Sequence, residues 1–140
     1  MLRSRQLWLG ILGTVLFLGL FFWRTDLGDM ADAWNARIQK FDKDLNPLAA
    51  FPVPGWAAND PTTKPYLALL PEGDIIASDP TRQRVLRIQP DGRIAAVYEG
   101  SDEIALAGPT GLAISGDTLF ISSTATNIVR RIPLSDLAPR

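Results

Sequence analysis

An aspartate and an arginine recur at a fixed spacing in two stretches of the chain, and these are the residues whose types could do chemistry. Asp79 and Arg84 begin and end "DPTRQR", and Asp32 and Arg37 begin and end "DAWNAR". A carboxylate and a guanidinium so placed can line a ligand groove, or they can pair with each other and with backbone N–H groups of one turn. We favour the pairing, in which both motifs fix hairpins, and keep the ligand groove as the alternative.

The composition removes most catalytic and metal chemistry. The chain has no cysteine and no histidine, which excludes thiolate or imidazole zinc sites, iron–sulfur clusters, the usual haem ligation and triads that use histidine. Two acidic pairs, Asp42 with Asp44 and Asp102 with Glu103, fall in expected turns or on opposite faces of a strand. No phosphate loop or nucleophile motif is present. We therefore predict that the protein is not an enzyme, and we assign no catalytic, metal-binding or cofactor-binding residue.

The two aspartate–arginine motifs belong to a longer repeat. Asp79 follows Asp32 by 47 positions, and Val129 follows Val85 by 44. A period in the mid-forties is the length of one four-stranded blade of a β-propeller. Between residues 65 and 134, short apolar runs alternate with turns rich in proline, glycine and aspartate, which is typical of antiparallel strands. The sequence therefore predicts a mainly β fold.

The order of residues within the repeat resembles the blades of the NHL-repeat β-propeller family, over roughly residues 30 to 134. The best copy matches the blade order at Pro65, Gly73, Asp79, Arg84, Val85, Ile88, Asp91 and Gly92. The first copy has Leu45 in place of the turn glycine, and the last copy has Ser123 and Ile128 in place of the aspartate and arginine. The resemblance implies antiparallel blades with these structural motif residues: Asp32, Arg37, Asp79, Arg84, Asp91 and Gly92.

Residues 37–140 are too few to close a propeller. A closed ring takes at least four blades of about forty residues, and this part of the chain holds about two and a half. We therefore expect incomplete blades with unpaired strand edges, which readily pair with another chain. A protein partner is expected to cover them.

A long apolar stretch precedes the repeats. Residues Leu7–Trp23 carry no charge and would span about 25 Å as a helix, close to the hydrocarbon thickness of a bilayer. We predict one transmembrane anchor over residues 1–24. Gly10, Gly13 and Thr14 fall on one face of this helix, where small side chains would let a neighbouring helix pack closely.

Charges on either side of the anchor predict its orientation. Arg3 and Arg5 precede it, while Asp26 and further aspartates follow it. The positive-inside rule then places the N-terminus in the cytoplasm and the β repeats outside the cell membrane. A cleaved signal peptide is the alternative, but the small-residue triplet Ala31–Ala33 lies far from the apolar run.

The segment after the anchor fits two structures. Apolar residues recur there at steps of three and four, as in an amphipathic helix, and Asp26 is placed to cap its start. The repeat instead predicts a strand over Arg37–Phe41. We expect a juxtamembrane stalk over residues 25–36, helical to about residue 35, followed by the extracytoplasmic β repeats of residues 37–140. Trp56 lies in a proline-rich loop, and we expect it to plug the packing between blades.

These observations predict a non-catalytic, single-pass accessory subunit. Its external β domain would bind and stabilise a larger membrane protein complex, such as a respiratory or photosynthetic one. The alternative is a shortened relative of the external propeller region of a polytopic membrane enzyme such as a glycosyltransferase. The expected partners are the membrane and other protein subunits, and the formal net charge of −1 argues against nucleic acid. The sequence does not identify a small-molecule ligand.

Overall fold

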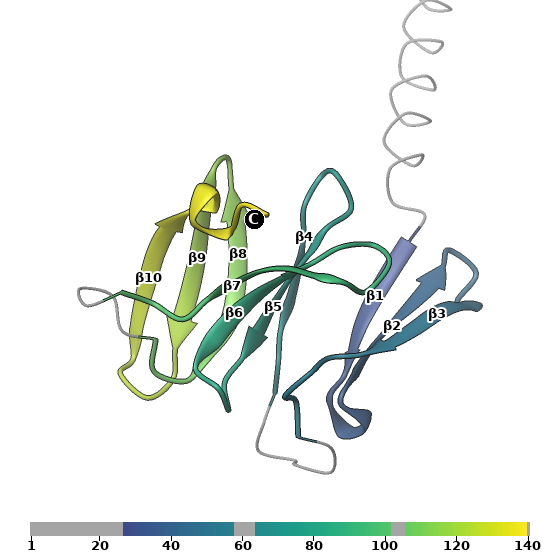
Figure 1. Ribbon diagram of the computed structural model, residues 1–140, viewed down its shortest axis with the longest axis horizontal. Coiled ribbons are helices and arrows are strands. Elements are labelled where there is room, and N and C mark those ends of the chain that lie inside the picture. Colours follow the sequence, from purple (N-terminus) through teal and green to yellow (C-terminus); the bar gives the residue numbers. More distant parts are fainter. Residues whose placement is uncertain (1–26, 58–63, 102–105, 140) are drawn as a thin grey trace, which may run out of the picture.

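Ten β-strands in three antiparallel sheets make up the part of the chain that the computed structural model describes, which is residues 27–57, 64–101 and 106–139 (Figure 1). Within each sheet the strands pair in chain order, so every connection is a hairpin. Short apolar runs separated by turn residues favour this arrangement. The mainly β fold with antiparallel blades is therefore confirmed.

Sheet 1 precedes the best repeat. It consists of β1 (Leu27–Asp32), β2 (Arg37–Asp42) and β3 (Pro47–Pro52). A 3₁₀ turn, η1 (Ala33–Asn35), joins β1 to β2. β1 and β2 pair without interruption from Leu27 opposite Asp42 to Asp32 opposite Arg37.

The prediction of a helix up to about residue 35 is wrong over the described residues 27 to 35, which form β1 and η1. A pattern at steps of three and four is weak evidence when the same residues also fit a two-residue alternation. Here the backbone groups of β1 pair with β2, and Ala31 packs into the core. Pairing and burial outweigh the helical pattern. The division into anchor, stalk and repeats stays a prediction.

Sheet 2 holds the four strands predicted for the best repeat. They are β4 (Leu67–Leu69), β5 (Ile75–Asp79), β6 (Arg84–Ile88) and β7 (Ile94–Tyr98), in that order across the sheet. Every residue of β5 is buried. Full burial places β5 at the centre of the molecule.

Sheet 3 holds the three strands predicted for the last repeat. They are β8 (Pro109–Ser115), β9 (Thr118–Ser123) and β10 (Ile128–Pro133). A second 3₁₀ turn, η2 (Leu134–Leu137), follows β10 and packs against β7 of sheet 2.

The repeat shows which strand each incomplete sheet lacks. Asp32 and Asp79 end β1 and β5, so β1, β2 and β3 correspond to β5, β6 and β7. Sheet 1 therefore has no counterpart of β4 among the described residues. In the same way β8, β9 and β10 correspond to β4, β5 and β6, and the described part of sheet 3 has no counterpart of β7.

Two apolar cores lie on the two faces of sheet 2, which stands between the other sheets (Figure 1). Side chains alternate along β5, so Ile76 faces sheet 3 while Ile75 and Ala77 face sheet 1. The core towards sheet 1 contains Ile38, Val53, Trp56, Ile75, Ala77, Leu86 and Ile88. The core towards sheet 3 contains Leu70, Ile76, Val85, Leu106, Leu119, Ile121, Ile132 and Leu137. The three sheets thus pack face to face as successive blades.

The predicted anchor over residues 1–24, with Gly10, Gly13 and Thr14, lies outside the described residues. Within the ranges that are described, the search for a helix long and apolar enough to cross a membrane finds none.

Candidate functional site

The aspartate–arginine motif of sheet 2 closes its own hairpin. Asp79 ends β5 and faces Arg84 at the start of β6. One carboxylate oxygen of Asp79 accepts a hydrogen bond from Arg84 Nε at 2.8 Å, and the other accepts one from the backbone N–H of Arg82 at 3.2 Å. The Asp79 side chain is fully buried, and that of Arg84 is 12% exposed. The carboxylate is therefore occupied inside the hairpin.

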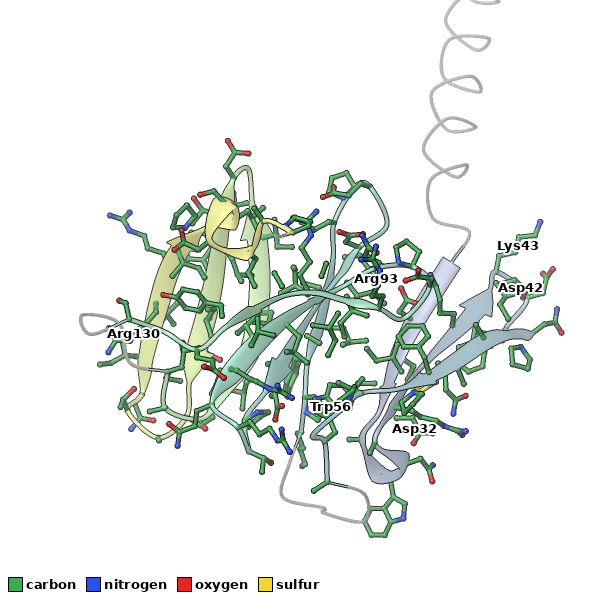
Figure 2. The ribbon with its side chains drawn as sticks, viewed as in Figure 1. Asp32, Asp42, Lys43, Trp56, Arg93 and Arg130 are labelled. Atoms are coloured by element: carbon green, nitrogen blue, oxygen red, sulfur yellow. The ribbon has the colours of Figure 1, made fainter. Side chains whose placement is uncertain are left out.

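The motif of sheet 1 is more open to solvent. Asp32, labelled in Figure 2, lies in this sheet. It accepts hydrogen bonds from Arg37 Nε at 2.8 Å, from Asn35 Nδ2 at 3.0 Å and from Gln39 Nε2 at 2.6 Å. The hydrogen bond from Arg37, followed by that from Asn35, lowers the pKa of the Asp32 carboxyl below its ordinary value of 3.8. The Arg37 side chain is 41% exposed. No neighbouring sheet covers this pair among the described residues.

The β9–β10 hairpin has the same backbone conformation as the other two but no aspartate–arginine ion pair. Ser123 ends β9 and faces Ile128 at the start of β10, as Asp79 faces Arg84. In all three hairpins the residue before the second strand has a positive φ: 51° at Ala36, 53° at Gln83 and 54° at Asn127. The turn therefore forms without the ion pair.

The Asp79–Arg84 pair also holds the connection between sheets 1 and 2. The Nη2 of Arg84 donates a hydrogen bond to the backbone oxygen of Pro54 at 2.5 Å. The next residue, Gly55, has a φ of 95°, and a Cβ there would collide with the side chains of Arg82 and Arg84. Trp56 follows and is buried in the core towards sheet 1, as expected for a packing plug (Figure 2).

A cation at one repeated position of the equivalent strands β2 and β6 reaches the next sheet, and sequence reasoning missed this feature. Lys40 Nζ in β2 donates to the Pro90 oxygen, in the turn after β6, at 3.4 Å. Arg87 Nη1 in β6 donates to the Leu137 oxygen, in the turn after β10, at 3.3 Å. The signal was present, because Lys40, Arg87 and Arg131 share the repeat spacing of 47 and 44 positions.

Arg87 is fixed more firmly than Lys40. Its Nε donates to Asp74 at 2.6 Å and its Nη2 to Glu72 at 2.9 Å. Its guanidinium therefore joins both carboxylates of the β4–β5 turn to the carbonyl of η2. Arg131, at the equivalent place in β10, is exposed, and its side chain has no hydrogen-bond partner among the described residues.

Asp29 in β1 is a second residue that sequence reasoning missed. It faces Lys40 across the β1–β2 ladder, at the repeat position that Ile76 occupies in sheet 2. Burial raises the pKa of the Asp29 carboxyl above its ordinary value of 3.8, and the nearby charge of Lys40 lowers it by less. One of its oxygens is buried without a hydrogen-bond partner among the described residues.

The Asp91–Gly92 turn lies against the neighbouring sheet. The Asp91 carboxylate accepts the backbone N–H of Arg93 at 3.0 Å. Gly92 has the positive φ expected for this turn, 90°. A Cβ on Gly92 would lie 2.7 Å from the ring of Phe51 in β3. The turn of one blade therefore needs glycine because a side chain of the preceding blade packs against it.

The face of sheet 3 that points away from sheet 2 is uncovered in the described part of the chain, whereas the equivalent face of sheet 2 is buried against sheet 3. We define the open face of sheet 3 by Ala113, Phe120, Ser122, Val129 and Arg131, which are cross-strand neighbours. Their counterparts in sheet 2 are Ala68, Ile76, Ser78, Val85 and Arg87, which face sheet 3.

Exposure differs sharply between the two copies of this face. Val85 is fully buried, while Val129 is 66% exposed. The local structure is nevertheless the same, because Ser78 and Ser122 each accept a backbone N–H, from Tyr66 and Gly111, at 2.8 Å. The open face is therefore a blade-packing surface without a blade on it among the described residues.

Ligand chemistry has little support in the described part of the chain. Its aspartates and glutamates include no group of three or more that could hold a metal ion. A hollow beside η2 is lined by Glu72, Arg87, Asp117 and Ser135 among others. Its arginine is already bound by Glu72 and Asp74.

Comparison with known proteins identifies the fold. No family model matches the chain, and no curated protein matches it. A catalytically inactive virginiamycin B lyase from Staphylococcus aureus, solved with quinupristin, has a TM-score of 0.61 and 22% identity over 81% of this chain and 36% of the lyase. A selenomethionine-substituted virginiamycin B lyase from the same organism has a TM-score of 0.52 and 16% identity, over 75% of this chain and 36% of the lyase. The chain thus spans about a third of the length of these structures.

This comparison corrects the prediction that the protein is not an enzyme. That prediction is contradicted because both solved structures reported above are lyases, which are enzymes. The missing histidines and cysteines excluded particular catalytic groups and did not exclude catalysis by a fold of this kind. At identities of 22% and 16% the likeness itself concerns the fold alone. The described chain is a set of three antiparallel blades of the β-propeller type.

Proposed function

We propose that this chain is an NHL-type propeller segment that binds another polypeptide through its open face, as a single-pass accessory subunit of a larger membrane protein complex. One observation carries the proposal. The same set of residues that sheet 2 buries against sheet 3 is repeated on sheet 3, where it is uncovered and includes Val129 at 66% exposure. Exposed apolar patches of this kind mark interaction sites.

Unpaired strand edges support the same function. The outer edge of β10 and the free edge of β1 have no neighbouring strand among the described residues. Unpaired backbone N–H and C=O groups on an edge favour pairing with another chain. Arg131, which is exposed on β10, places a cation beside this edge, which disfavours indiscriminate pairing and favours an acidic partner.

The location is proposed from the sequence. Residues 1–24 would anchor the chain, with the N-terminus in the cytoplasm and the blades outside. An anchor would hold the open face close to the external surfaces of other membrane proteins, which raises its effective concentration for them.

The proposal can be tested with two valine variants. We expect Val129→Asp to lose the proteins that co-purify with the tagged full chain from its native membranes, because a charge would be buried in the contact. Val97→Asp is the matched control, since Val97 is 41% exposed on β7 of sheet 2, away from the open face. Co-purification of the same proteins with both variants and the original chain would refute the proposal.

A further inference from the structure

We propose that the open face of sheet 3 binds sheet 1 of a second copy of this chain, so that copies associate head to tail. The inference rests on the proposed function and identifies the partner of the same face. The chain contains two interfaces between blades, one between sheets 1 and 2 and one between sheets 2 and 3, and these serve as templates for the contact. The open face of sheet 3 and the outward face of sheet 1 are the two uncovered surfaces that would form a third interface of the same kind.

The two interfaces within the chain follow one rule. In each, a cation on one of the equivalent strands β2 and β6 donates to a backbone carbonyl that follows the equivalent strand, β6 or β10, of the next sheet. Lys40 donates to Pro90 in this way, and Arg87 donates to Leu137. Arg131 is the third cation of the series, and its side chain is exposed. By the same rule, Arg131 would donate to a carbonyl in the turn between the strands of another blade that correspond to β6 and β7.

Sheet 1 presents such a turn. The segment between β2 and β3 lies where the Pro90 turn lies in sheet 2, with Lys43 at the position of Pro90. Its residues 43–46 are exposed and include Asp44, and Asp42 directly precedes them at the end of β2. The Asp42 side chain accepts the backbone N–H groups of Asp44 and Asn46 at 2.8 and 2.9 Å. The backbone oxygens of Asp42 and Asn46 accept N–H groups within the turn, whereas that of Lys43, at the position of Pro90, accepts none among the described residues. An acidic turn complements Arg131, the cation of the open face.

The shapes of the two halves also agree. In the first interface Gly92 is required because Phe51 of the preceding sheet's last strand packs against it. Sheet 3 has no counterpart of that last strand among the described residues. At the position of Gly92, sheet 1 has Leu45, which has a φ of 63° and is 78% exposed. A leucine side chain would fill the place that the phenylalanine fills in the first interface.

Apolar residues on the outward face of sheet 1 complete the match. Met30 and Phe41 occupy the positions of Ala77 and Ile88, which pack sheet 2 onto sheet 1. Met30 is exposed and Phe41 is partly exposed. In the proposed contact, Met30 and Phe41 of one copy would pack against the open face of the other copy, which includes Val129. The contact is therefore heterologous, since different surfaces of the two copies meet.

A complementation experiment tests this arrangement with the full chain in detergent. Val129→Asp alters the open face only, and Leu45→Lys alters the turn of sheet 1 only. Both side chains are largely exposed, so each variant should keep the unfolding transition of the original chain. The original chain should self-associate, and each variant alone should do so about a hundredfold more weakly, because each substitution buries a charge where the contact has an apolar side chain.

The mixture of the two variants gives the decisive readout. With different affinity tags, Val129→Asp and Leu45→Lys should form a heterodimer, because the first retains an intact sheet 1 and the second retains an intact open face. Light scattering should show one copy of each. A monomeric original chain, unimpaired self-association of either variant, or the lack of a heterodimer would overturn the inference.

These outcomes are distinct from a failure of the proposed function. A different polypeptide that co-purifies from native membranes and is lost with Val129→Asp, together with a monomeric purified chain, would overturn the second copy as partner and leave the function standing. If Val129→Asp changes neither the co-purifying proteins nor the self-association of the chain, both the proposed function and the second copy as partner are overturned.

Discussion

At the residue scale, burial separates two motifs that look alike in the sequence. Asp79 and Arg84 are enclosed, and the arginine also reaches Pro54 in the connection to sheet 1. Asp32 and Arg37 make the same ion pair on an uncovered face. A hydrogen bond to a buried charged group contributes more to stability than an exposed one, because the cost of leaving a partner unpaired is larger.

Substitution of the two aspartates should therefore have unequal effects. Asp79→Ala should lower the free energy of unfolding by about 1 to 3 kcal/mol, since it removes two hydrogen bonds and leaves Arg84 without its carboxylate. Asp32→Ala should have a clearly smaller effect. Urea unfolding of both variants checks this. Equal losses, or full stability of Asp79→Ala with loss of a bound ligand, would favour the ligand groove.

Two carboxylates should give stability changes of opposite sign with pH. Asp32 has a lowered pKa, so its contribution is present above 3.8 and is lost as the pH falls through the folded-state value. Asp29 has a raised pKa, so folding favours its protonated form, and that contribution is lost as the pH rises through the folded-state value. At pH 7, Asp32→Asn should lower the melting temperature and Asp29→Asn should raise it. Both differences should shrink below pH 3.8, and pH-independent differences would contradict this account.

At the element scale, turns and strand pairing decide what the sequence could predict. The strands of sheets 2 and 3 were predictable because short apolar runs are bounded by proline, glycine and aspartate. β1 was not, because its apolar residues also fit a helix and its pairing with β2 is a tertiary effect. The carbonyl contacts of Lys40 and Arg87 join segments 50 positions apart, so they become visible only once the sheets are stacked.

The equivalent turn positions 92 and 45 give a prediction at this scale. Gly92→Val should destabilise the chain by about 2 to 4 kcal/mol, because a β-branched residue is strained at a φ of 90° and would collide with Phe51. Leu45→Gly should instead stabilise an isolated chain by about 0.5 to 1 kcal/mol, since it relieves a positive φ on an exposed residue. Thermal unfolding compares them. A loss of stability in Leu45→Gly would show that the leucine packs within its own copy.

At the scale of the whole molecule, three stacked sheets bury both faces of the middle one and leave an outer face on each side. The blade architecture was predictable from the repeat, because its period matches one blade. The open face was not, since exposure depends on which sheet has a neighbour.

The membrane orientation is a prediction of this scale too. Protease added to right-side-out vesicles should digest residues after about 30 and leave the anchor, and protection of the blades would refute the orientation.

The central claim is that the open face of sheet 3 contacts another polypeptide in the native membrane. Site-specific photo-cross-linking tests it most directly, with a photoreactive amino acid placed at position 129 or, as a control, at position 97. Both positions are exposed valines on strands of neighbouring sheets. The account predicts a cross-linked adduct of higher mass from position 129 and little or none from position 97. No adduct from position 129, or equal adducts from both positions, would contradict it.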